Sequence, residues 1–311
     1  MRLGGVPIDK QSCNKYDNRG GYRAHVDHET IGPGYEAMRK IILIVMPALF
    51  LFGCAAAPVY RSRAVFTDGD TAVRKTAEDI AIKAASKTLP LREELTYSVR
   101  WLGLSIGSVT ARIKGTEKIQ GRDAHVLEIT ARSNDLISAI YPVNDRYVSY
   151  IDTERLHVLR CEVYRSEGRY RKNAITDFDQ EGHKAYFRNL NDKSEKTIAI
   201  PPGVQDPVSM AYFFRTVPLE IGKEMEFNVY NNESVYLLYG VADKKEFVRV
   251  PGRKGMQEAF HVQPFAKLKG ELVKKGRASC YFSCDEKRVP LVGIVKGPVF
   301  TEVVAYLEKA E

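Results

Sequence analysis

The 311-residue sequence has little of what most enzymes use for chemistry. It contains six histidines, and those beyond residue 54 are scattered: His125, His157, His183 and His261. The spacings typical of a zinc site, a phosphate-binding loop and a G-x-S-x-G nucleophile turn are missing. We therefore expect neither a metal ion nor a cofactor. A hydrolase stays open as an alternative, because a catalytic triad can assemble from residues far apart in sequence.

The sequence also lacks an apolar run long enough to span a bilayer as a helix, which takes about 20 residues. Its main apolar run, Ile41 to Phe52, is interrupted by Pro47 and follows Arg39 and Lys40. A short basic region followed by about a dozen apolar residues is typical of an export signal. We therefore interpret residues 38–53 as a signal peptide.

The apolar run ends in Leu51-Phe52-Gly53-Cys54, which resembles the bacterial lipobox. This resemblance implies that Cys54 receives diacylglycerol and palmitate and becomes the mature N-terminus. Ala55, where an Asp would favour retention at the inner membrane, indicates the periplasmic face of the outer membrane in a Gram-negative host. The alternatives are ordinary cleavage near Ala55 to Ala57 and an uncleaved anchor.

Residues 1–37 do not fit a signal peptide, because they carry Cys13, His25 and His28 and little apolar periodicity. Signal peptides begin close to their basic region, and Met38 stands immediately before Arg39. We expect residues 1–37 to be either a wrongly assigned gene start or a disordered leader.

Charge and cysteine content limit the remaining classes. The net charge of +8 is spread among acidic residues rather than gathered in a stripe, so nucleic acid is not an expected partner. Cys280 and Cys284 would lie roughly 13 Å apart along one strand, too far for a disulfide. Cys161 could pair with either of them, but three buried thiols are the preferred interpretation.

The composition changes at about residue 90. Residues 54–90 predict a tether containing one helix, Thr71 to Lys87, with apolar residues at helical spacing. Residues 91–311 alternate short segments rich in Val, Ile, Thr, Tyr and Phe with Gly, Asn, Asp and Pro turns, which is typical of an all-β domain. Since no βαβ alternation is present, we expect a large antiparallel sheet curled into a barrel or half-barrel.

Two features of this β-rich region can be placed more closely. The clearest alternation runs over Leu95 to Trp101, and separate strands are predicted over Val235 to Val241 and Glu246 to Val250. One helix interrupts the strands: Asp206 is a suitable N-cap and Pro207 fits the first helical position.

The chain resembles the exported bacterial family catalogued as domain of unknown function 3108. The likeness is carried by four segments in order: Leu95 to Leu104 with Gly107, Gln205 to Arg215, Tyr281 to Pro290, and Gly297 to Leu307. It implies a β-rich domain that faces the periplasm, often lipid-anchored or secreted, with no established enzymatic activity. The fold it implies is similar to that of lipoproteins associated with capsule and exopolysaccharide export.

The predicted helix carries the candidate site residues. Asp206, Ser209, Tyr212 and Arg215 are three apart and share one helical stripe. In a functional interpretation Arg215 clamps a carboxylate or sugar acid over Tyr212. In a structural interpretation Asp206 and Ser209 cap the helix, Tyr212 packs in the barrel and Arg215 pairs with a carboxylate of the sheet.

The sequence thus favours a non-enzymatic module for binding or assembly in the biogenesis of the cell envelope or exopolysaccharide. Its expected partners are the membrane, through the lipid anchor, and a glycan, lipid or envelope protein. The alternatives are a hydrolase of envelope polymers and a carrier of an apolar ligand.

Overall fold

The computed structural model of the chain describes residues 89–268, 271–272, 278–296 and 301–311. The predicted leader, the signal peptide, Cys54 and the helix Thr71 to Lys87 lie outside the described residues. Leu89, which the sequence places in the tether, is buried in the main core. Across the described part of the chain, no helix has the length and apolar character needed to cross a membrane.

The described chain forms one 15-stranded sheet. Every ladder between neighbouring strands is antiparallel. The strands are β1 (Glu93–Trp101), β2 (Leu104–Ile119), β3 (Arg122–Ser133), β4 (Asn144–Asp152), β5 (Val158–Glu167), β6 (Tyr170–Asp179), β7 (Lys184–Asn189), β8 (Glu195–Ala199), β9 (Glu224–Asn231), β10 (Ser234–Arg249), β11 (Met256–Leu268), β12 (Glu271–Leu272), β13 (Ala278–Ser283), β14 (Pro290–Lys296) and β15 (Glu302–Ala310).

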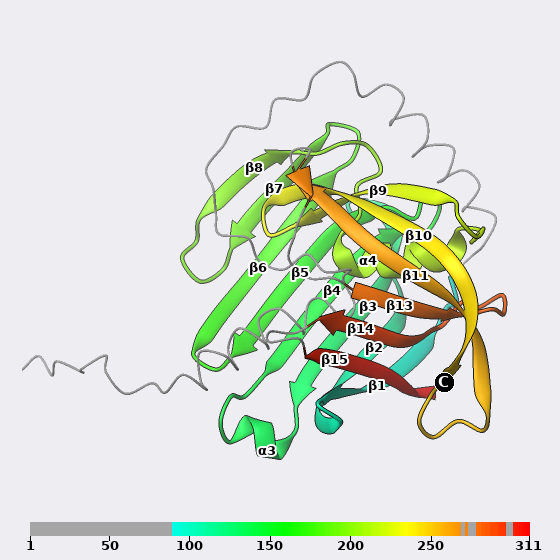
Figure 1. Ribbon diagram of the computed structural model, residues 1–311. Coiled ribbons are helices and arrows are strands. Elements are labelled where there is room, and N and C mark those ends of the chain that lie inside the picture. Colours follow the sequence, from blue (N-terminus) through cyan, green and yellow to red (C-terminus); the bar gives the residue numbers. More distant parts are fainter. Residues whose placement is uncertain (1–88, 269–270, 273–277, 297–300) are drawn as a thin grey trace, which may run out of the picture.

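The order of the strands brings the two ends of the domain together. It runs β8-β7-β6-β5-β4-β3-β2-β1-β15-β14-β13-β11-β10-β9, with β12 beside β11. Strand β1 therefore pairs with β15, from Leu95 opposite Ala310 to Trp101 opposite Val303. The sheet curls around helix α4 (Pro207–Thr216), and β8 and β9 are its two edges (Figure 1). The all-β, barrel-like architecture expected from the sequence is confirmed.

Helix α4 begins as the sequence predicts. The Asp206 carboxylate accepts hydrogen bonds from the amides of Val208 and Ser209, and the Ser209 hydroxyl accepts one from the Asp206 amide. This reciprocal arrangement is a capping box with Pro207 at the start of the helix. The buried helical residues include Met210 and Phe214, so α4 supplies much of the apolar filling that the curled sheet needs.

The core has two parts. The larger cluster packs α4 against β1–β3, β9–β11 and β13–β15. Phe214 touches the rings of Phe227 and Phe282, at centroid distances of 6.1 and 5.1 Å. Gly240 makes this possible, because a Cβ atom there would lie 3.2 Å from the Phe214 ring. The smaller cluster lies between β5–β8 and the hairpin of β9 and β10, with Phe178 and Tyr230 edge to face at 5.1 Å.

Several details differ from the expectations. The two strands predicted over 235–250 are one long strand, β10, in which the register shifts between Ala242 and Lys244. The polar residue at the shift, Asp243, explains why the alternation looks broken in sequence. Cys284 lies just beyond β13 rather than inside it. Cys161, Cys280 and Cys284 are free thiols, so the alternative disulfides are not formed.

Candidate functional site

The four candidate residues at the start of and along α4 face two different environments. Arg215 is buried and donates to both carboxylate oxygens of Glu93, at 2.6 and 2.8 Å, and to the carbonyl of Lys287 at 3.2 Å. Tyr212 is buried beside it, 5.1 Å from the Arg215 guanidinium to the ring centroid. Ser209 is used in the cap. These three residues face the filled core. The bidentate ion pair of Arg215 with Glu93, the helix cap and packing explain their positions.

Asp206 faces a different space. It lines a cleft at the N-terminal end of α4, together with residues of β4–β7 and of the turn between β9 and β10. The enclosed volume of the cleft is about 60 Å³, and the wider hollow around it is open to solvent.

The wall of the cleft is mainly apolar. The register places Cys161 of β5 opposite Thr176 of β6, which in turn lies opposite Phe187 of β7. Val163 and Ala174 form the next inward row. Since side chains of directly opposed residues share one face of a sheet, these rows form one continuous concave surface. Pro207 and Val208 cover it from α4.

Basic side chains stand along one edge of the cleft. The Lys172 ammonium lies 3.7 Å from the Glu233 carboxylate and 3.3 Å from the Asn232 carbonyl oxygen. Lys196 of β8 pairs with the same Glu233 carboxylate. The side chains of the turn between β9 and β10 thus link the two edges of the sheet, β8 and β9. Among the described strands these two edges form no backbone ladder with each other.

The charge of Lys172 is incompletely balanced. Burial lowers the pKa of Lys172, although Glu233 acts in the opposite direction. The ammonium is therefore less stable here than in water, and an additional anion beside it would be favourable.

Asp206 supplies a buried polar group at the floor. Burial raises the pKa of Asp206 to about 6, against the hydrogen bonds from Ser149, Ser209 and Val208. The amides of Val208 and Ser209 both donate to Oδ1, whereas Oδ2 and the nearby Ser149 hydroxyl are buried polar atoms without a well-formed hydrogen bond.

A second buried arginine, Arg165, lies under the cleft. Its Nε donates to Glu167 at 3.0 Å and also lies 3.8 Å from an Asp145 carboxylate oxygen. Both carboxyl groups are fully buried. Burial and then the charge of Glu167 raise the pKa of Asp145 to about 8, which favours a proton retained by this pair of acids.

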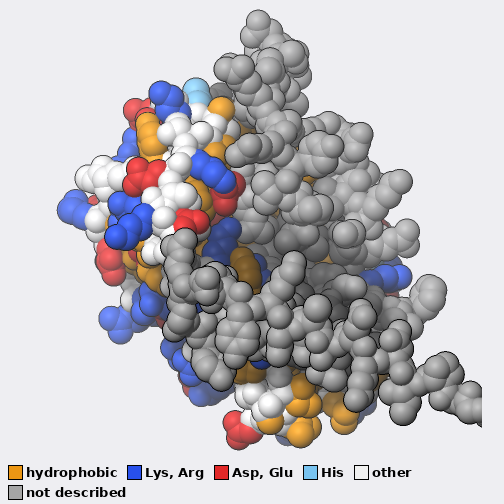
Figure 2. Space-filling model, turned by 90° about the vertical axis from the view of Figure 1, so that its left-hand side faces the viewer, with side chains coloured by type: hydrophobic (Ala, Val, Ile, Leu, Met, Phe, Trp, Pro, Cys, Tyr) orange, Lys and Arg blue, Asp and Glu red, His pale blue; other side chains and the backbone are white. Residues whose placement is uncertain are grey.

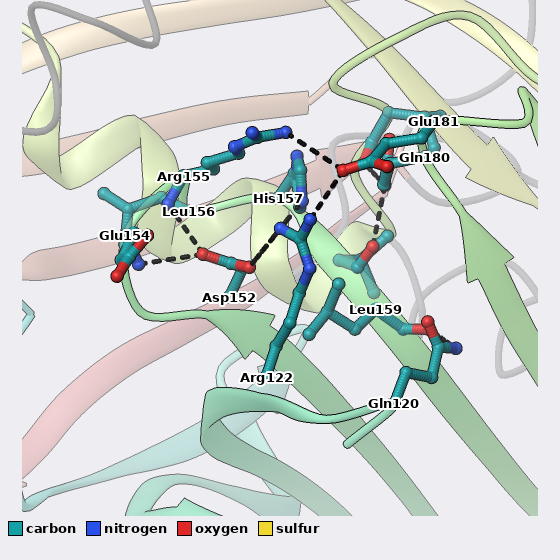
Figure 3. Close-up of polar contacts among 12 residues, drawn as sticks. Gln120, Arg122, Asp152, Glu154, Arg155, Leu156, His157, Leu159, Gln180 and Glu181 are labelled. Atoms are coloured by element: carbon teal, nitrogen blue, oxygen red, sulfur yellow. Dashed lines mark hydrogen bonds and ion pairs between the residues drawn. The ribbon is translucent and has the colours of Figure 1, made fainter. Parts of the chain in front are cut away.

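A further polar network joins three turns at one end of the sheet (Figure 3). Arg122 donates to Asp152 at 3.1 Å and to Glu181 at 2.6 Å, and the amides of Glu154 and Arg155 donate to Asp152 at 2.8 Å. His157 stands 4.0 Å from Asp152, and burial lowers the pKa of His157 to about 4. The Asp152 carboxylate thus accepts hydrogen bonds from Arg122 and from the turn that follows β4, an arrangement suited to holding that turn in place.

Sequence reasoning identified Asp206 but missed Arg165, Lys172 and Glu233. These residues belong to no motif, and Glu233 comes from a turn far along the chain. The one available signal was periodicity: Arg165 and Lys172 occupy inward positions of their strands, opposite each other, where alternation calls for apolar residues.

The described residues contain no cluster of three or more His, Cys, Asp or Glu side chains arranged to hold a metal ion. The cleft lining offers one thiol, Cys161, and burial raises its pKa well above the ordinary value. A thiol in that state is a poor nucleophile and a poor ligand at neutral pH.

Three solved structures of low sequence identity align with most of this chain. One is a β-barrel-like protein of domain of unknown function DUF1849 from Brucella abortus, with TM-score 0.47, 9% identity, and 71% of this chain and 97% of that chain covered. Another, described as an exported protein with a YmcC-like fold from Bacteroides fragilis, has TM-score 0.29, 9% identity and coverages of 70% and 95%. A third, described as a lipoprotein from Parabacteroides distasonis, has TM-score 0.31, 8% identity and coverages of 71% and 96%.

No curated protein matches the sequence. The family model of DUF3108, a protein family of unknown function, matches residues 96–298. This match includes β1 to β14 almost completely, and with them α4 and every residue of the cleft. The chain therefore belongs to the DUF3108 family.

Proposed function

We propose that this chain is a non-enzymatic binding module of the cell envelope, whose cleft holds a ligand with an apolar body and an anionic head. The cleft carries the proposal, because the inward rows of β5–β7 and the start of α4 line it with mainly apolar side chains. An apolar wall favours a hydrocarbon or similar body. It thereby joins two hypotheses from the sequence, the binding module and the carrier of an apolar ligand.

The basic edge supports the anionic head. Lys172 and Lys196 both pair with the carboxylate of Glu233, so two cations share one anion. A carboxylate or phosphate of the ligand would complete the neutralisation of Lys172.

The envelope location rests on the sequence. The signal-like run before Cys54 supports export and lipid attachment, so that the domain works on a membrane tether. Within that setting the expected partners are the membrane and an amphiphilic or glycan ligand of the envelope.

Catalysis is the less favoured function for this cleft. Among its described lining residues there is no histidine beside Cys161 or Thr176, and the Asp152–His157 pair lies in the turn network of Figure 3. A nucleophile adjacent to a base is the usual mark of covalent catalysis. The cleft provides instead an apolar wall and a basic edge, which suit binding.

Binding of 11-(dansylamino)undecanoic acid, a fluorescent probe with an apolar chain and a carboxylate, tests the proposal. We expect one probe per chain with increased emission, and loss of binding in Ala174→Phe, which fills the wall. Ala199→Phe is the matched control, because Ala199 is exposed on β8. Absence of binding, or equal binding by Ala174→Phe and the control, would refute the cleft as the site.

A further inference from the structure

Four large aliphatic side chains are exposed at one end of the molecule. Leu102, Leu104, Leu136 and Ile140 are 66, 71, 72 and 57% exposed. Leu102 lies in the turn between β1 and β2, Leu104 begins β2, and the other two belong to helix α3 (Asp135–Ser138) and the turn after it. We call these four residues the apolar tip.

Hydrogen bonds hold the two parts of the tip together. The Asn134 side chain donates to the Ser105 carbonyl at 2.7 Å, and the Asn134 amide donates to the Ile106 carbonyl at 3.1 Å. Helix α3 is thus fastened one residue away from Leu104. Figure 1 shows α3 and the β1–β2 turn at the same lower end, and Figure 2 shows hydrophobic side chains gathered there.

The backbone conformation of the turn between β1 and β2 is unfavourable for the leucine at position 102. Leu102 and Gly103 have φ angles of 51° and 80°, as both central residues of a type I′ turn require. Asn or Gly is the usual choice at the first of these positions, whereas leucine is strained there. A strained leucine that is also exposed stabilises neither the turn nor the core, which points to a function in contact with something outside the domain.

Positive charge adjoins the tip. The Gly168 amide donates to the Pro142 carbonyl at 2.8 Å, so the turn between β5 and β6 packs against the segment that follows α3. That turn carries the exposed Arg169 and Arg171. With the exposed Arg132 at the end of β3, these arginines outnumber Asp135, the one exposed carboxylate of α3.

We propose that the apolar tip inserts into a lipid bilayer with anionic headgroups, as a second membrane contact independent of any acyl chain at Cys54. Aliphatic side chains on a projecting turn and a one-turn helix favour an acyl environment, because each leaves water on insertion. The adjoining arginines match the negative surface of such a bilayer. This contact would orient the domain on the membrane.

Trp101 makes the proposal directly testable. It is the only tryptophan of the chain, it directly precedes Leu102, and its indole donates to Thr301 at 3.1 Å. Its fluorescence therefore reports the tip and no other part of the chain. The full chain carrying Cys54→Ala would be mixed with vesicles of phosphatidylcholine and phosphatidylglycerol, with and without brominated acyl chains.

We expect the brominated vesicles to quench Trp101, with weaker quenching when phosphatidylglycerol is omitted. Leu102→Asn combined with Leu136→Gln should reduce vesicle affinity about tenfold or more. Asn relieves the positive-φ strain at position 102, so this variant is expected to fold. Arg169→Glu with Arg171→Glu should weaken binding mainly to the anionic vesicles.

The matched control is Ile221→Ser with Phe247→Ser, because these side chains are 51 and 65% exposed but lie outside the tip. Unquenched Trp101 in vesicle-bound protein would overturn the proposal, since another face or a partner protein would then explain the exposed leucines. Equal loss of affinity in the control and tip variants would overturn it as well.

Discussion

The two buried arginines among the described residues of the domain lie in different halves of its interior. In the half filled by α4, Arg215 meets one carboxylate, Glu93, in a two-point ion pair. In the half beneath the cleft, Arg165 meets two, Asp145 and Glu167. One guanidinium neutralises one carboxylate, so the second arrangement leaves a carboxyl group without a compensating charge, which favours its protonated form.

The packing differs in the same way. Around α4 the apolar side chains fill the space between helix and sheet. Cys161 and Phe187 instead line the cleft. The difference indicates that the α4 half serves mainly stability, whereas the cleft half combines a partly open apolar wall with charged side chains suited to a ligand. The predictions below test this division.

The largest effect is expected at Arg215. Arg215→Met leaves Glu93 as a buried charge without its partner, which should lower the free energy of unfolding by about 3–5 kcal/mol. Urea denaturation measures this. Arg112→Met is the control, because Arg112 forms a similar pair with Glu94 at 45% and 35% exposure and should cost about 0–1 kcal/mol. Equal losses in the two variants would contradict a structural role for Arg215.

Phenylalanine truncation compares the packing of the two halves. Phe214→Ala should cost about 3–4 kcal/mol, because it removes apolar contacts and leaves a cavity in the filled core. Phe187→Ala should cost about 2 kcal/mol, since its space opens into the existing cleft and only the transfer of apolar surface is lost. Thermal or urea unfolding gives both values, and a larger loss for Phe187→Ala would show that the cleft half is the more tightly packed.

Asp145 should give the cleft half a pH dependence that the α4 half lacks. The folded-state pKa of about 8 lies above the unfolded value, so the folded chain holds an extra proton between roughly pH 4 and 8. Its stabilising contribution is therefore complete at acid pH and lost as pH rises through 8, by at most about 1.4 kcal/mol per pH unit.

Asp145→Asn isolates this contribution, because the amide can still accept from the Ser166 amide, as Asp145 does at 2.8 Å. The difference in unfolding free energy between the natural chain and the variant should change steadily between pH 5 and 8. Asp206 and His157 titrate in both proteins and cancel from the difference. A constant difference across this range would show that Asp145 is not protonated in the folded state.

The sequence predicted local features well and distant juxtapositions poorly. The N-cap Asp206 was visible because capping depends on neighbours within three residues, and β1 was visible because its alternation is regular. The pairing of Arg215 with Glu93 was foreseen in type but not in partner. A groove for an apolar ligand was foreseen as an alternative, but its place was not, because its walls come from β5–β7 and its edge from a turn after β9, which only the curl of the sheet brings together.

The smallest effect concerns Glu233, which holds Lys172 and Lys196 at the edge of the cleft. If an anionic head takes the place of Glu233 beside Lys172, the two compete. Glu233→Gln should then tighten binding of the dansyl probe about two- to fivefold, as expected for one partly exposed ion pair, while the free energy of unfolding falls by about 0.5 kcal/mol or less. Lys172→Met should weaken binding, since it removes the cation for which both anions compete.

Glu220→Gln provides the matched control, because Glu220 pairs with Lys223 at the surface, at 2.9 Å and 60% and 58% exposure. Fluorescence titration at low and high salt compares the three variants, and the gain in Glu233→Gln should shrink as salt screens the charges. Weaker binding in Glu233→Gln would mean that Glu233 itself contacts the ligand. The basic edge would then serve to hold the turn against the sheet rather than to recognise the carboxylate of the probe.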